Sequence, residues 1–375
     1  MRIPQRLQLV KYTVLIGILI SVLLSVNLWA GQRWFPKAPL FNSLASIPEP
    51  YDYINLAVLI LLLFFSFISS SKKPIIFLIL FSIYLCVDDQ NRLQPWFYNY
   101  ILILLIYLFY KQRVDEPNNY ITVFISIQVL IALVYIFSGL QKINSHFVPE
   151  TFSWFISPLK SILKPRQMTI LMGFGKFTPY LEIMIGLGLL TKPTRYIILP
   201  IVIMMHIFIL FMLGPTGKSF NYVVWPWNIM MIILDLVLFA SVDKERFFDI
   251  AFLFKGLCFY IVITLMFIFP IFSFQNKYDS YLSSSLYSGN THKCTLILSD
   301  NAYYKLPYYI KNFVTKNADY NILNISKWSM SELHAPCAPE YRVFKTVQFY
   351  IMHITQTSAK DVKMEFIERE KLFNF

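Results

Sequence analysis

Long apolar runs follow one another through the first 273 residues of this 375-residue chain. A helix needs roughly 20 predominantly apolar residues to cross the hydrocarbon core of a bilayer, and most of the runs approach that length. We therefore predict a mainly α-helical, polytopic transmembrane bundle over residues 1–274. We expect about nine spans, near residues 10–30, 54–71, 75–88, 98–110, 120–140, 177–191, 196–213, 222–241 and 250–273.

The composition agrees with an integral membrane protein. Hydrophobic residues make up 57% of the chain and charged residues only 14%, whereas soluble domains carry about 25% charged residues. The net charge of +12 would suit a nucleic-acid partner, but the basic residues form short clusters between apolar runs. That placement is typical of topology signals and of contacts with anionic lipid headgroups. We therefore expect membrane lipid, and no nucleic acid, as a partner.

The basic residues also predict an orientation, because they occupy alternate connectors. They precede the first run and follow the second, fourth, sixth and eighth, as Lys72-Lys73, Lys111 with Arg113, Lys192 with Arg195 and Lys244 with Arg246. The positive-inside rule places these connectors and the N-terminus in the cytoplasm, and we expect a bacterial inner membrane. A retained first helix is preferred, and a signal peptide cleaved near Ala30 is the alternative. With nine spans, the C-terminal region lies outside.

Residues 275–375 differ from the rest because they are polar and turn-rich. THKCTLILS (residues 291–299) and YRVFKTVQFYIMHIT (residues 341–355) show strand-like alternation. We therefore predict a small extracytoplasmic α+β domain. Cys294 and Cys337 both lie in it, and an oxidising compartment would allow them to form a disulfide.

The chain contains no Walker loop, GxGxxG, GxSxG, HExxH or CxxC motif. The stretch SELHAPCAPEYR (residues 331–342) holds two glutamates, a histidine and Cys337. A metal site is conceivable there, but a disulfide with solvated neighbours explains the stretch more simply. No metal is therefore predicted.

Ionisable groups at membrane depth are costly, so each is a functional candidate. Lys142, Glu182 and His206 are the candidate catalytic residues, and the candidate binding residues are Asp89, Arg92, Trp96, Trp225 and Asn228. Most of them have a structural alternative. The tryptophans suit an interfacial belt, Asp89 and Arg92 suit a loop ion pair, Lys142 could snorkel to the headgroups, and His206 could merely bond a neighbouring helix.

Lys142 ends a run whose Ser138 and Gly139 are small enough to let another helix approach closely. A lysine packed there would be partly desolvated, and desolvation favours the neutral amine, which is a usable base. Glu182 would oppose this if it were close, because a nearby carboxylate favours the ammonium. The sequence leaves both outcomes open.

YIFSGLQKIN (residues 135–144), followed by an aromatic segment with Trp154, resembles a helix-end motif of the vitamin K-dependent γ-carboxylase and horizontally transferred transmembrane (HTTM) domain superfamily. His206, a glycine turn and a helix with Trp225 and Asn228 are similar to that family's later section. The resemblance covers roughly residues 75–240. It implies that Lys142 is a base that deprotonates a hydroquinone cofactor, and that the C-terminal part is lumenal.

The chain also departs from the carboxylases. Gln141 stands where the mammalian enzyme has a second lysine, and a region of about a hundred residues replaces the much longer lumenal part. These departures argue against propeptide binding, and hence against glutamate carboxylation. A second stretch, PYLEIMIGLGLLTKPTRYIILPIVIMMHIF (residues 179–208), is similar to DoxX-type membrane proteins, some of which are linked to quinone reduction. Both resemblances imply a quinone or hydroquinone held in a helix bundle.

We therefore expect a carboxylase-like membrane protein that binds a quinone-type lipid and acts on an exported peptide or protein. Lys142 would be the base, Glu182 and His206 would orient groups or relay protons, and Asp89 with Arg92 would close the outer mouth. One alternative is a non-enzymatic scaffold or assembly factor that presents residues 275–375 to an exported partner, and another is a DoxX-like oxidoreductase subunit. A scaffold predicts that Lys142, Glu182 and His206 do not converge on one cavity.

Overall fold

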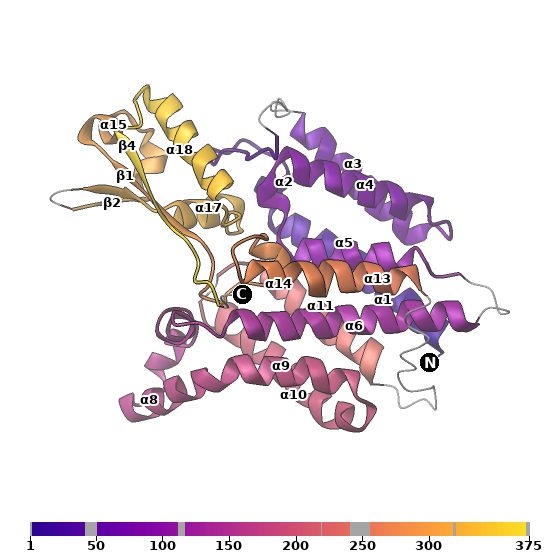
Figure 1. Ribbon diagram of the computed structural model, residues 1–375. Coiled ribbons are helices and arrows are strands. Elements are labelled where there is room, and N and C mark those ends of the chain that lie inside the picture. Colours follow the sequence, from indigo (N-terminus) through magenta and orange to yellow (C-terminus); the bar gives the residue numbers. More distant parts are fainter. Residues whose placement is uncertain are drawn as a thin grey trace.

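Figure 1 shows the computed structural model, which describes residues 2–41, 51–111, 117–218, 220–240, 256–317 and 320–372. The chain is mainly helical and carries one small sheet. The helices of the bundle are α1 (Ile3–Leu24), α3 (Asp52–Ile68), α4 (Lys73–Asp88), α5 (Pro95–Tyr107), α6 (Pro117–Gln141), α8 (Pro165–Phe174), α9 (Thr178–Leu190), α10 (Lys192–Leu213), α11 (Val224–Phe239), α13 (Leu257–Ile263) and α14 (Phe269–Ser273).

Prolines mark the starts of many of these helices. A proline occupies the first or second position of α4, α5, α8, α9 and α10. Proline has no backbone N–H, and the first turn of a helix has no intrahelical partner for one, so proline begins a helix at little cost. The sequence thus sets where these helices begin.

Four helical segments in the described part of the chain are long and apolar enough to span a membrane: Ile3–Leu24, Asn119–Gln141, Pro165–Leu190 and Lys192–Leu213. Four is fewer than the nine expected, so the nine-span count is not supported. The helices α3, α5 and α11 are apolar but have 17, 13 and 16 residues. Residues 241–255, which include the expected topology signals Lys244 and Arg246, lie outside the described residues.

The close pairing of α6 with α9 depends on glycine. A Cβ added to Gly139 would lie 2.5 Å from the carbonyl oxygen of Pro179, and one added to Gly186 would lie 2.6 Å from that of Ala132. Each helix therefore brings a glycine against the backbone of the other, as small residues allow in membrane bundles. This confirms the expectation that Gly139 lets a neighbouring helix approach.

The sheet lies at the end of the bundle where α6 finishes, and the N-terminus lies toward the other end (Figure 1). Its strands are β1 (Lys293–Leu298), β2 (Val314–Lys316), β3 (Asn321–Leu323) and β4 (Val362–Ile367). They are antiparallel in the order β2-β3-β1-β4, and Leu296 of β1 faces Leu323 on one side and Met364 on the other. The expected strand within residues 291–299 is confirmed by β1.

The second expected strand is wrong, because residues 341–355 form the helix α18 (Tyr341–Thr355). Its buried side chains include Val343, Val347 and Ile351. A spacing of four residues puts them on one helical face, which covers the sheet. The alternation of β-branched and aromatic residues suggested a strand, but the four-residue repeat in the same stretch decided the structure.

The sheet region is joined to the helical bundle by buried polar contacts. The carboxylate of Glu332, at the end of α17 (Ile325–Leu333), accepts hydrogen bonds from the backbone N–H groups of Trp34 and Phe35. Asn91 accepts one from the N–H of Ala338 at 3.2 Å, and Gln94 donates one to the Pro336 carbonyl at 2.8 Å. Part of the 331–342 stretch therefore docks the sheet region onto the bundle.

Candidate functional site

A cavity of about 650 Å³ lies among α5, α6, α9, α10 and α11. Its wall is mostly aromatic and aliphatic, as in many ligand sites. All three candidate catalytic residues, Lys142, Glu182 and His206, line it. The other polar side chains of the wall include Asn99, Tyr135, Ser138, Thr151, Thr178, Asn228 and Ser284. Ionisable groups from three helices thus meet in one apolar chamber.

Lys142 lies just beyond the last residue of α6 and is 9% exposed. Its Nζ donates to Glu182 Oε2 and to Ser138 Oγ, both at 2.6 Å. Glu182 is 7% exposed and reaches the lysine from α9. The ammonium is therefore turned inward to a buried carboxylate, not extended toward the headgroups. The pair lies in a site with little water, where each partner offsets the cost of burying the charge of the other.

His206 of α10 belongs to a second buried group, beside the first. Its Nε2 lies 2.7 Å from the Tyr135 hydroxyl, and its Nδ1 lies 2.8 Å from Asn228 Oδ1. The Tyr135 hydroxyl also lies 2.6 Å from Asp235 Oδ2. His206 therefore bonds neighbouring helices, as one structural alternative expects, and it also lines the cavity.

Sequence reasoning missed Tyr135 and Asp235. Asp235 interrupts the apolar run of α11 and is fully buried, so the argument that selected Glu182 applied to it as well. Tyr135 lies seven residues before Lys142, which puts the two on one face of α6. That spacing was the available signal for Tyr135.

Two further polar atoms at the cavity have no hydrogen-bond partner within the described part of the chain. They are Nε1 of Trp96 and Oδ1 of Asn99, both buried and both on residues that line the cavity. Buried polar atoms are nearly always paired, so these two atoms on cavity-lining residues are groups that a ligand could satisfy. One is a donor and the other is an acceptor.

Trp225 does not line the cavity. Its Nε1 donates to the Leu213 carbonyl at 3.0 Å and so ties the start of α11 to the end of α10. The tryptophan that faces the cavity from α11 is Trp227. The sequence did not separate these two, because both are tryptophans in the first turn or so of one helix, with only Pro226 between them.

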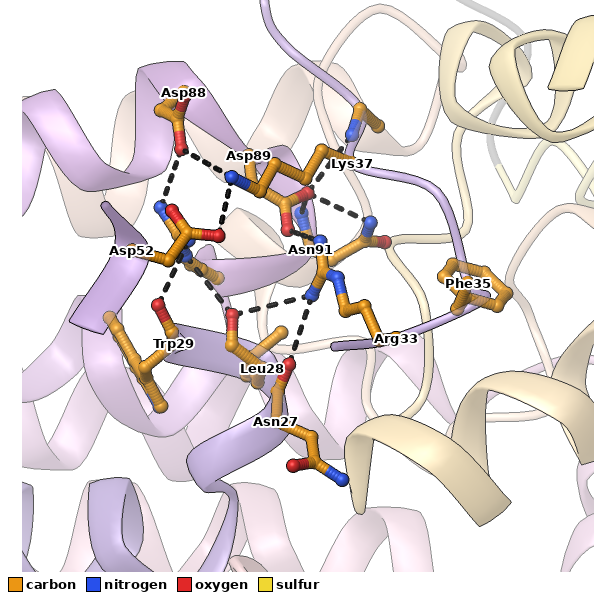
Figure 2. A network of polar contacts seen from close by, with 12 residues as sticks. Asn27, Leu28, Trp29, Arg33, Phe35, Lys37, Asp52, Asp88, Asp89 and Asn91 are labelled. Carbon is orange, nitrogen blue, oxygen red and sulfur yellow. Dashed lines mark hydrogen bonds and ion pairs between the residues drawn. The ribbon is translucent and has the colours of Figure 1, made fainter. Parts of the chain in front are cut away.

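Asp89 and Arg92 also lie away from the cavity wall. Asp89 belongs to the polar network that Figure 2 shows. Arg92 is fully buried and donates to Asp88 Oδ2 at 2.8 Å and to the carbonyl of Leu28 at 3.1 Å. Asp89 forms an ion pair with Arg33 and accepts from the N–H of Ala38 at 3.1 Å. The two residues therefore anchor the segment that follows α1.

The electrostatics of this network favour an ionised Asp89. Burial alone would raise the pKa of Asp89, but the charges of Arg33 and Arg92 and the hydrogen bonds from Arg33 and Ala38 lower it below its usual value. The negative charge of the carboxylate is thus balanced by the two nearby guanidinium groups. Such a network holds a loop in place and leaves little capacity for proton exchange.

The cavity has a roof and a side opening. Ser284, Leu286 and Tyr287 contribute the roof, which comes from the segment that leads into the sheet. The Tyr287 ring stacks on Trp154 at a centroid distance of 6.0 Å. At the side, the lining residues Phe174, Phe177 and Met204 are 60, 66 and 60% exposed, so the cavity opens between α8, α9 and α10 on an apolar outer face.

The expected disulfide is not formed, since Cys294 and Cys337 are both free. Burial raises the pKa of each thiol to about 12. Thiols that stay protonated are poor nucleophiles for disulfide exchange. Within the described residues, no group of three or more His, Cys, Asp or Glu side chains is placed to hold a metal ion.

Comparison of the chain with protein-family models, with curated proteins and with solved structures finds no match.

Proposed function

We propose that this chain is a membrane protein whose cavity binds a quinone-type lipid and transfers protons to and from it, with Lys142 as the base. The observation that carries the proposal is the convergence of Lys142, Glu182 and His206 on one cavity. A scaffold without chemistry would not need three costly ionisable groups in one apolar chamber. The convergence therefore favours a chemical site over a scaffold.

The two orphaned atoms fit such a ligand. Trp96 Nε1 would donate to a ring carbonyl or hydroxyl oxygen, and Asn99 Oδ1 would accept from a ring hydroxyl. The side opening supports a ligand from the lipid phase, because its rim is formed by exposed aromatic and aliphatic side chains. A lipid-soluble molecule could pass this rim without crossing water.

A hydroquinone, when bound, supplies an ionisable ring hydroxyl. Lys142 accepts a proton from that position only as a free amine. The amine forms when the Lys142 proton passes to Glu182 across their 2.6 Å hydrogen bond, which turns a buried ion pair into a neutral pair. Burial away from water disfavours the charged ammonium and carboxylate relative to the neutral amine and acid. The proton transfer from Lys142 to Glu182 therefore costs less free energy in the cavity than it would in water. Glu182 thus holds the lysine proton while Lys142 acts as the base.

An exported peptide or protein would complete the reaction at the roof. The roof is built by residues 284–287, which belong to the same region as the sheet. A polypeptide bound to that region would lie at the end of the cavity where Lys142 sits. We place this surface outside the cytoplasm, with the N-terminus inside a bacterial inner membrane, in keeping with the carboxylase-like class that the sequence resembles.

The test uses purified protein in lipid nanodiscs and a short-chain hydroquinone as the probe. Lys142→Ala should weaken binding of the probe, or slow oxidation of the probe by an added electron acceptor, at least tenfold, because the acceptor takes electrons from the deprotonated probe. Lys176→Ala removes an exposed lysine before α9 and serves as the matched control. Wild-type binding and turnover in Lys142→Ala would refute the assignment. Quinone reduction by the protein with a separate electron donor would instead favour the DoxX-like subunit.

A further inference from the structure

The Tyr135 unit, defined here as Tyr135, His206 and Asp235, contains a hydroxyl between two hydrogen-bonding partners. The hydroxyl oxygen lies 2.7 Å from His206 Nε2 and 2.6 Å from Asp235 Oδ2. A tyrosine hydroxyl has one proton, so it donates to only one partner. At distances this short, the other partner has to donate to it.

Asn228 determines which ring nitrogen of His206 carries a proton. The Asn228 Nδ2 donates to the Val224 carbonyl at 2.7 Å, so the amide oxygen is the atom that faces His206 Nδ1 at 2.8 Å. An oxygen there accepts, and Nδ1 therefore carries hydrogen. In a neutral ring Nε2 is then a bare acceptor.

Two proton arrangements satisfy these contacts. In the first, Asp235 is protonated and donates to Tyr135, and Tyr135 donates to a neutral His206. In the second, His206 is an imidazolium that donates to Tyr135, and Tyr135 donates to an ionised Asp235. If Asp235 were ionised and His206 neutral, Asp235 Oδ2 and His206 Nε2 would both be acceptors, and only the single Tyr135 hydroxyl proton would lie between them. The contacts therefore require one additional proton in the Tyr135 unit.

Burial selects the first arrangement as the resting state. Asp235 is fully buried, and its Oδ1 has no hydrogen-bond partner among the described residues. A bare carboxylate oxygen inside an apolar helix bundle costs far more than a bare carbonyl oxygen. A protonated Asp235 avoids that cost.

We propose that the Tyr135 unit stores a proton beside the cavity, with Asp235 protonated at rest. The stored proton is used by a concerted shift. The Asp235 Oδ2 proton moves to Tyr135 Oη, while the Tyr135 hydroxyl proton moves to His206 Nε2. No electron is transferred and the net charge of the unit stays zero. The shift makes His206 positive, and His206 lines the cavity whereas Asp235 does not.

A positive charge at this wall would stabilise an oxyanion that forms on a ligand in the cavity, without a proton from solvent. This use of the stored proton rests on the proposed function. The presence of the proton does not, because it follows from the hydrogen bonds and from burial alone.

Infrared spectroscopy of the ligand-free protein in nanodiscs at neutral pH tests the proposal. A protonated carboxyl gives a carbonyl band that is separate from the carboxylate bands. Wild type should show such a band, and Asp235→Asn should lose it. The Lys142→Met/Glu182→Gln double variant should keep it, because that variant removes the carboxyl that lines the cavity but leaves Asp235 in place. Tyr135→Phe should keep the band at a shifted frequency, which gives a second readout if Asp235→Asn does not fold.

Nitrogen NMR of histidine-labelled protein gives the complementary result. The His206 resonances, assigned by their loss in His206→Gln, should report a neutral ring protonated at Nδ1. A carboxyl band insensitive to both Asp235→Asn and Tyr135→Phe would overturn the proposal, and so would an imidazolium at rest. Neither measurement needs a ligand, so failure to bind a hydroquinone would leave this inference standing.

Discussion

The Lys142–Glu182 pair gives the sharpest test of how the cavity is stabilised. Removing one partner leaves the other charge buried, because Lys142 and Glu182 are only 9 and 7% exposed. At 2.6 Å and an effective dielectric constant of about 20, the direct attraction is about 6 kcal/mol before desolvation is subtracted. Breaking a buried pair from one side costs about 3–5 kcal/mol. We expect that loss of unfolding free energy for Lys142→Met and for Glu182→Gln separately.

The double variant should behave differently. It removes both charges and keeps similar side-chain volumes, and replacing a buried pair by uncharged residues is often neutral. We expect Lys142→Met/Glu182→Gln to lie within about 1–2 kcal/mol of wild type, so the coupling in the cycle is large. The assay is reversible unfolding in mixed micelles titrated with a denaturing detergent. Single variants that each lose less than about 1 kcal/mol, or a double variant that loses their sum, would refute this account.

Two further predictions concern packing and pH. Gly139→Leu should prevent folding, because its Cβ alone would lie 2.5 Å from the Pro179 carbonyl oxygen. Gly173→Leu is the control and should fold, because nothing lies within 4 Å of a Cβ at that position. Equal yields of folded protein from the two variants would contradict this prediction. His292 accepts from the Arg369 N–H at 3.1 Å, and burial, then the Arg369 charge, lowers its pKa to about 4. Between pH 6.5 and about 4 only the unfolded state binds that proton, so unfolding free energy should fall as pH decreases through this window. His292→Asn keeps an acceptor and should flatten that part of the profile, and an unchanged profile would exclude His292 as its source.

Much of the candidate site was readable from the sequence because charge inside an apolar run is conspicuous. Lys142, Glu182 and His206 were found in that way, and the structure places all three at one cavity. Their partners were harder to find. A tyrosine in a membrane helix usually looks like packing, so Tyr135 carried no signal apart from its spacing to Lys142.

Long-range pairing explains the other differences. Asp89 and Arg92 looked like site residues because nothing in the local sequence reveals Arg33, which lies 56 positions before Asp89 and pairs with it. Residues 341–355 fit two periods at once, and only packing against the sheet selects the helical one. The number of spans depends on helix ends, which an unbroken apolar composition does not mark.

The geometry of the site depends on one helix contact more than on any single charge. Tyr135 lies in α6 and Lys142 directly follows its last residue, and both line the cavity, so a small rotation of α6 would move the ion pair and the Tyr135 unit together. That rotation is fixed where Gly139 and Gly186 bring the backbones of α6 and α9 together. The same contact carries Glu182 to Lys142. A substitution at either glycine that is small enough to allow folding would therefore still separate the acid–base groups, so we expect such a variant to lose proton transfer while its helices stay packed.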